Sequence, residues 1–126
     1  MELNKISSEI ISSAIAVHRE LGPGLLESVY QSCLIVEFTK KGLQIDSEVP
    51  VPVIYQGIKV NADGFRLDLL VEGLVVIELK SVDKIHPIHK KQLLTYLRLA
   101  NKPLGLLINF NETTLVNGIT RIANGV

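Results

Sequence analysis

The sequence of residues 66–80 is RLDLLVEGLVVIELK, and this stretch decides the fold. Its Leu, Val and Ile content predicts two β-strands, over 66–71 and 75–82, joined by a tight turn at Gly73. Successive side chains of a strand point to opposite faces of the sheet. The length of the turn therefore decides which charged residues share a face.

Two turn lengths give different sites. A two-residue turn at 72–73 would place Asp68 and Glu78 on opposite faces, whereas a three-residue turn at 72–74 places them opposite each other. Only the longer turn keeps one face entirely apolar, and burial selects against a slip of one residue. That face would contain Leu67, Leu69, Val71, Val75, Ile77 and Leu79. We therefore predict the three-residue turn, or an equivalent bulge.

Opposed carboxylates repel each other, so the pair at Asp68 and Glu78 needs neutralising. Arg66 and Lys80 lie on the same predicted face and can do this through a surface salt-bridge lattice, which is the more common arrangement. A divalent cation is the other solution, because magnesium and manganese prefer sites with one or two carboxylates and water. The pattern alone leaves both open.

The rest of the chain predicts one α/β domain over residues 1–126, with a central mixed sheet flanked by helices. Apolar spacing predicts helices over 4–21, 26–41 and 87–100, and further strands over 49–55, 58–60, 104–109 and 115–122. Asn4 or Ser7 is expected to cap the first helix. The strands 75–82 and 104–109, joined by the third helix, form a parallel crossover with 104–109 inside the sheet.

Composition excludes several classes of protein. The chain has 126 residues, 47% of them apolar, and its 13 basic and 13 acidic residues cancel. It is therefore neither a disordered tail nor a coat protein that binds nucleic acid by charge alone. No apolar run is long enough to span a membrane, and the first residues do not form a secretory signal. The single Cys33 fits a reducing compartment, so we expect a cytoplasmic protein.

Residues 24–30 read GLLESVY, which is G-x-x-E-x-x-Y, and the chain resembles the bacterial and archaeal GxxExxY proteins. The resemblance continues through residues 65–71, 77–80, 92–97 and 105–111. The GxxExxY proteins are assigned to the PD-(D/E)XK nuclease superfamily, and the spacing of Asp68 and Glu78-Leu79-Lys80 matches its signature. Leu67 stands where the signature has proline. Gln92-x-x-x-Tyr96 resembles the extra motif of the RecB-like and Cas4-like branch.

This resemblance implies a restriction-endonuclease-like core and a phosphodiesterase site with Mg²⁺ or Mn²⁺. The implied metal ligands are Asp68, Glu78 and the backbone carbonyl of Leu79. The implied catalytic residues are Lys80, Glu27 and Gln92. The residues expected to contact substrate are Tyr96, His89, Lys84, Lys90 and Tyr30. For Tyr30 a half-buried structural role is the alternative, and His18 is expected to be an interior histidine.

We therefore expect a metal-dependent nuclease, a hydrolase that acts on DNA. The alternatives are a non-catalytic nucleic-acid-binding or assembly module with the same fold, and, more weakly, a hydrolase of small phosphates. The chain is short and carries little positive charge with which to select a substrate. A homodimer could supply the missing surface through the edge strand 49–55 or the C-terminal strand.

Overall fold

The computed structural model describes residues 2–125, and at residues 62 and 63 only the backbone. The elements are α1 (Leu3–Leu21), α2 (Glu27–Lys40), β1 (Ile45–Tyr55), β2 (Ile58–Val71), β3 (Val75–Lys80), α3 (Pro87–Ala100), β4 (Leu104–Asn109), the 3₁₀ helix η1 (Leu115–Gly118) and β5 (Ile119–Ala123). Among these residues, no helix is long and apolar enough to cross a membrane.

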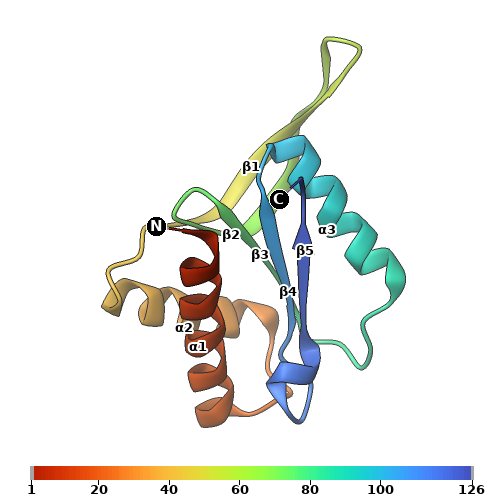
Figure 1. The fold of residues 1–126 in the computed structure, drawn as a ribbon. Coiled ribbons are helices and arrows are strands. Elements are labelled where there is room, and N and C mark those ends of the chain that lie inside the picture. The colour runs from red at the N-terminus through yellow and green to blue at the C-terminus, as the bar shows by residue number, and fades with distance from the viewer. Residues whose placement is uncertain (1, 126) are drawn as a thin grey trace.

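The five strands form one mixed sheet in the order β1-β2-β3-β4-β5. Helices α1 and α2 cover one face, and α3 covers the other (Figure 1). The sheet pairs antiparallel except between β3 and β4, where Val75 pairs with Leu104 in parallel. This confirms the α/β class and the crossover through α3. β4 lies inside the sheet as expected, with all six of its residues buried.

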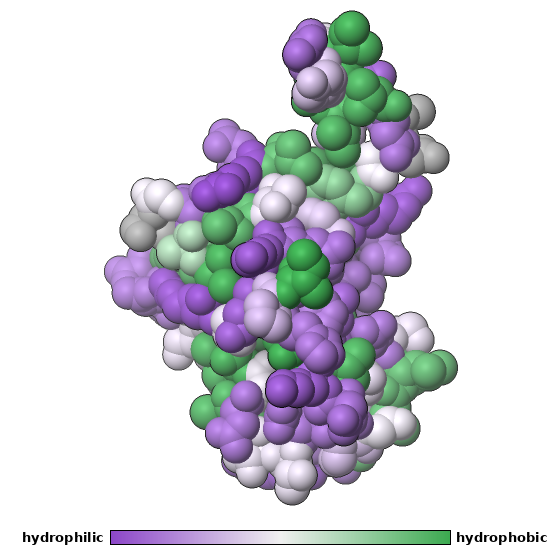
Figure 2. All heavy atoms as spheres, turned by 90° about the vertical axis from the view of Figure 1, so that its right-hand side faces the viewer, coloured by the Kyte–Doolittle hydropathy of each residue, from purple (hydrophilic) through white to green (hydrophobic). Residues whose placement is uncertain are grey.

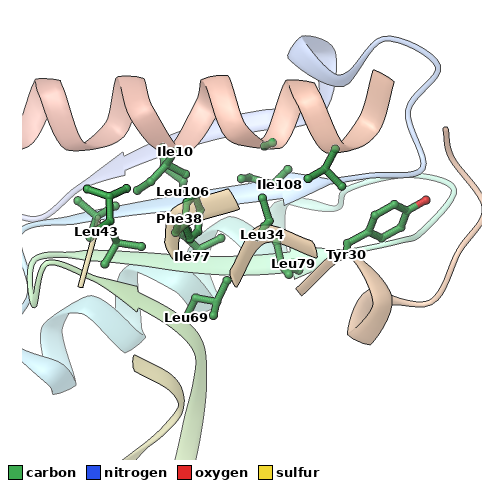
Figure 3. Close-up of a cluster of buried hydrophobic side chains, with 14 of the residues drawn as sticks. Ile10, Tyr30, Leu34, Phe38, Leu43, Leu69, Ile77, Leu79, Leu106 and Ile108 are labelled. Carbon is green, nitrogen blue, oxygen red and sulfur yellow. The ribbon is translucent and has the colours of Figure 1, made fainter. Parts of the chain in front are cut away.

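The turn between β2 and β3 has three residues, because Val71 pairs with Val75 across it. Glu72 and Gly73 both have positive φ there, at 54° and 66°. The turn therefore fixes the predicted pairing. Val75, Ile77 and Leu79 of β3 lie in the larger core, between the sheet and helices α1 and α2 (Figure 3), whereas Val76 lies in the smaller core on the α3 side.

One residue departs from the predicted apolar face. Leu67 packs on the α3 side with Leu70 and Leu97, whereas Leu69 packs on the α1 and α2 side. The alternation of β2 therefore changes parity near Asp68. Glu48, which lies opposite on β1 between the paired residues Ser47 and Val49, has a φ of 50°. A local distortion of the strand pair explains why simple alternation predicted the wrong side for Leu67.

The elements differ from prediction in several places. β3 ends at Lys80 and not at residue 82. β1 begins at Ile45, because residues 45–47 pair with 69–71. The predicted strands 58–60 and 66–71 are one strand. The predicted strand 115–122 is wrong at its start, where η1 precedes β5. Neither predicted N-cap is right, since Glu2 precedes α1 without a side-chain bond and Ser7 donates to the carbonyl of Asn4 inside the helix.

Candidate active site

Asp68 on β2 and Glu78 on β3 lie side by side. The backbone N–H of Leu79 donates to Oδ2 of Asp68 at 2.8 Å, and the N–H of Asp68 donates to Oε1 of Glu78 at 3.4 Å. Each carboxylate is thus held by the backbone of the neighbouring strand. The three-residue turn brings the two acids together as the sequence predicts.

Burial disfavours the simultaneous ionisation of the two acids. It raises the pKa of Glu78 from 4.5 to about 8, and the negative charge of Asp68 adds to this. Burial also raises the pKa of Asp68, although the hydrogen bond from Leu79 lowers it. Desolvation and a like charge both favour the neutral form of a carboxyl group. Without a cation, the pair therefore holds a proton at neutral pH.

Neither acid of the pair forms a salt bridge in the described part of the chain. The one salt bridge found there joins Lys41 to Glu9, at 3.1 Å. A divalent cation would supply the missing positive charge, because it would replace the shared proton and compensate both negative charges. The salt-bridge lattice considered from sequence is therefore wrong for Asp68 and Glu78.

Few groups at this site could serve as metal ligands. Among the described residues, no group of three or more His, Cys, Asp or Glu is placed to hold a metal ion. Two carboxylates and a backbone carbonyl nevertheless suit Mg²⁺, which commonly keeps several water ligands. Asp68, Glu78 and the carbonyl of Leu79 would hold such an ion.

Lys80 ends β3, two residues after Glu78. Its positive charge lowers the pKa of Glu78, which places the ammonium close to the pair without a direct ion pair. Its backbone carbonyl accepts a hydrogen bond from the N–H of Phe110 at 2.9 Å. The backbone of Lys80 is therefore fixed, while its side chain stays partly exposed.

Glu27 is the first residue of α2 and is exposed. Its negative charge contributes to the raised pKa of Asp68, as does that of Glu48. One turn along α2, Nε2 of Gln31 donates to the backbone carbonyl of Asp68 at 3.4 Å. The start of α2 therefore lies beside the acid pair, although Glu27 does not complete a three-acid cluster.

Tyr30 does not contact substrate as expected, because it is fully buried. Its ring stacks on Phe110 with centroids 4.3 Å apart. Its hydroxyl points away from the other labelled core side chains in Figure 3, donates to the carbonyl of Gly22 at 2.6 Å and accepts from the N–H of Leu25 at 3.1 Å. Tyr30 instead shapes the loop that leads into Glu27, so its structural alternative is the right one.

Two polar side chains that the sequence analysis missed hold the segment after Lys80. Ser81 Oγ donates to the carbonyl of Leu25 at 2.7 Å, which ties the end of β3 to the loop before α2. Asn109 is fully buried, accepts from the N–H of Val82 at 3.1 Å and donates to its carbonyl at 2.9 Å. The signal for Asn109 was present, since it is the one polar residue at the end of an apolar strand.

On α3, the structure places Tyr96 near the acids. Its ring stacks on Phe65 at 4.1 Å, and the charges of Glu78 and Asp68 add to the burial that raises its pKa. Gln92 lies one turn earlier and is exposed.

His89 and the expected lysines are placed differently. Nδ1 of His89 accepts the N–H of His86 at 3.0 Å and so caps α3. Lys84 and Lys90 together line a cavity of about 230 Å³ that also includes Thr120, and neither Asp68 nor Glu78 lines it. The expected interior role of His18 is confirmed, because its Nε2 lies 2.7 Å from the carbonyl oxygen of Glu112.

Comparison with known protein families gives one decisive match. Residues 4–122 match the family described as the PD-(D/E)XK nuclease superfamily. The chain belongs to this superfamily. The matched range contains Glu27, Asp68, Glu78 and Lys80. Searches of curated proteins and of solved structures found no match.

Proposed function

We propose that this PD-(D/E)XK protein is a divalent-metal-dependent nuclease that hydrolyses phosphodiester bonds in DNA. One observation supports this above all. The buried carboxylate of Glu78 and the half-buried carboxylate of Asp68 lie together on neighbouring strands without a salt bridge in the described residues, and Lys80 follows Glu78 on β3. The superfamily match supports a nuclease-like fold around them.

Each of these groups has a distinct part in the proposed reaction. When bound, Mg²⁺ or Mn²⁺ would polarise the phosphoryl oxygen and lower the pKa of an attacking water toward neutrality. Asp68, Glu78 and the Leu79 carbonyl would hold the ion. The hydrogen bond from the N–H of Leu79 orients the carboxylate of Asp68.

Lys80 stabilises the negative charge that develops on the phosphate. Charge stabilisation needs no change in protonation, so it is the role we propose.

The remaining residues contribute from the rim of the site. Glu27 adds negative charge beside Asp68 and helps to attract the cation. Tyr96 and Gln92 lie on the α3 side, where Tyr96 is close enough to the acids for their charges to act on it. We propose that these two residues, with His89, Lys84 and Lys90, contact the DNA. Membership of the GxxExxY proteins and of the RecB-like and Cas4-like branch is part of the same proposal.

The test is cleavage of duplex, branched and single-stranded DNA with Mg²⁺ or Mn²⁺. Three near-isosteric variants are compared with the wild type: Asp68→Asn, Glu78→Gln and Lys80→Met. Each is expected to lose cleavage by about a hundredfold or more while staying folded. Asp46→Asn and Lys5→Met change exposed residues of the same types elsewhere and should cleave like the wild type.

Two outcomes contradict the proposal. Equal residual cleavage in all variants would identify a contaminating nuclease. DNA binding by a wild-type protein that cleaves with neither metal would support the non-catalytic module instead.

A further inference from the structure

Strands β1 and β2 continue beyond the sheet as a two-stranded arm, which we define as residues 53–61. β3 pairs with β2 only over residues 69–71, so the arm has no third strand. Tyr55 pairs with Ile58 across a two-residue turn, at which Gln56 and Gly57 have φ values of 50° and 79°. The arm projects clear of the body of the molecule (Figure 2).

The arm is strongly apolar for a projecting element. Ile54, Tyr55, Ile58 and Val60 are 53%, 63%, 65% and 57% exposed. Lys59 is its one charged residue. An isolated two-stranded hairpin is marginally stable in water, and clustered exposed apolar side chains mark an interaction surface. The arm therefore has the properties of an element that docks on another surface.

A groove of about 310 Å³ lies at the base of the arm, between β1 and the C-terminal end of α3. Its lining includes Pro50, Pro52, Leu67, Leu70, Leu99 and Ala100. None of the residues 53–61 lines it, so the arm does not fill the groove of its own chain. Leu99 is 42% exposed at this groove.

We propose that the arm of one chain docks in this groove on a second copy of the chain, and that the second arm docks reciprocally. The arm and the groove adjoin along β1, with residues 49–52 in the groove and 53–61 in the arm. A two-fold axis near this junction brings each arm to the other groove, which gives the self-complementary interface of a closed dimer. This inference does not depend on nuclease activity.

Charge favours a second copy over nucleic acid as the partner. Interfaces with DNA are strongly positive, whereas the arm carries Lys59 alone. The edge strand beside the groove carries two exposed acids, Asp46 and Glu48, neither in a salt bridge within the described residues. Lys59 at the tip of one arm complements these acids on the other chain.

The first test is the oligomeric state by sedimentation velocity over a wide range of concentration. The wild type should be a dimer, and Ile58→Lys should raise its dissociation constant by at least about tenfold. Ile88→Lys is a matched control, because Ile88 is also 65% exposed but lies on α3 outside the arm and the groove. A monomeric wild type at every concentration, or equal weakening by both variants, would overturn the proposal.

The second test identifies the docking site by cross-linking. In a Cys33→Ser background, one chain carries Ile58→Cys and the other Leu99→Cys, and the mixture is treated with a short thiol cross-linker. A cross-linked pair that contains both chains supports arm-in-groove docking. Cross-links confined to pairs of Ile58→Cys chains would show that the arms pair with each other, and would overturn arm-in-groove docking. The proposal would also be overturned if the wild type were monomeric and Ile58→Lys lost DNA binding.

Discussion

Oδ2 of Asp68 accepts a hydrogen bond from the backbone N–H of Leu79 at 2.8 Å. The carboxylate thereby takes the place of a backbone acceptor between β2 and β3. This arrangement ties the acid of one strand to the residue that follows the acid of the other. The strand register and the proposed metal site therefore depend on the same contact.

The first prediction concerns Glu78 and pH. Its pKa is raised from 4.5 to about 8 in the folded protein, so its charged form destabilises the fold. Stability is therefore highest below about pH 4.5 as far as this group is concerned, and falls as pH rises to about 8. Glu78→Gln stays neutral, and in metal-free buffer at pH 9 it should be more stable than the wild type by roughly 2 to 4 kcal/mol.

Urea unfolding of both proteins between pH 4 and 9 measures this difference. Near pH 4 the two free energies of unfolding should agree closely, because Glu78 is then protonated in both states. Parallel pH curves for the two proteins would show that Glu78 ionises normally.

The second prediction concerns the metal. Mg²⁺ or Mn²⁺ should raise the melting temperature of the wild type, because it binds the folded state only. Asp68→Asn should lose most of this response, whereas Asp46→Asn should keep it. Because the ion replaces a proton on the acid pair, affinity should rise by about tenfold per pH unit below pH 8. Titration calorimetry measures the affinity for the metal. An affinity that does not change with pH would contradict the replacement of a proton by the ion.

The third prediction concerns Asn109, whose side chain clamps Val82 to the end of β4. Asn109→Ala leaves the half-buried backbone groups of Val82 without these partners and should lower the free energy of unfolding by about 2–4 kcal/mol. Asn117→Ala, at an exposed position of η1, should cost about 0.5 kcal/mol or less. Denaturant unfolding measures both, and similar costs would mean that water replaces the clamp.

The fourth prediction separates the ring of Tyr30 from its hydroxyl. Tyr30→Phe keeps the stacking on Phe110 but removes the contacts with Gly22 and Leu25, and should cost about 1–2 kcal/mol. Because that loop leads into Glu27, cleavage should fall as well. If Tyr30 bound substrate directly, its replacement would instead change the KM for DNA and leave stability unaltered.

Local sequence determined much of the fold. Pro87 sets the start of α3, and the run of apolar residues in β4 predicts an interior strand. The three-residue turn after Val71 followed from keeping apolar residues on one face. These features depend on neighbours along the chain. The period at which apolar residues recur, two in strands and 3.6 in helices, is therefore enough to find them.

The side occupied by Leu67 could not be predicted in this way. It depends on the distortion where Glu48 faces Asp68, and these residues are far apart in sequence. The continuation of β2 through residues 61–65 and the projecting arm likewise depend on pairing with β1. Period-two alternation assumes a regular strand, and it fails where a partner strand bends it.

For the candidate site, the sequence by itself determined the residue types and the pairing of Asp68 with Glu78. Only the tertiary structure decided that Glu78 is buried and Asp68 half-buried without a salt bridge in the described chain, that Tyr30 shapes a loop, and that Asn109 holds the segment after Lys80. Burial and hydrogen bonding depend on segments brought together from distant parts of the chain. A side chain's pKa and role therefore follow from packing that no local pattern records.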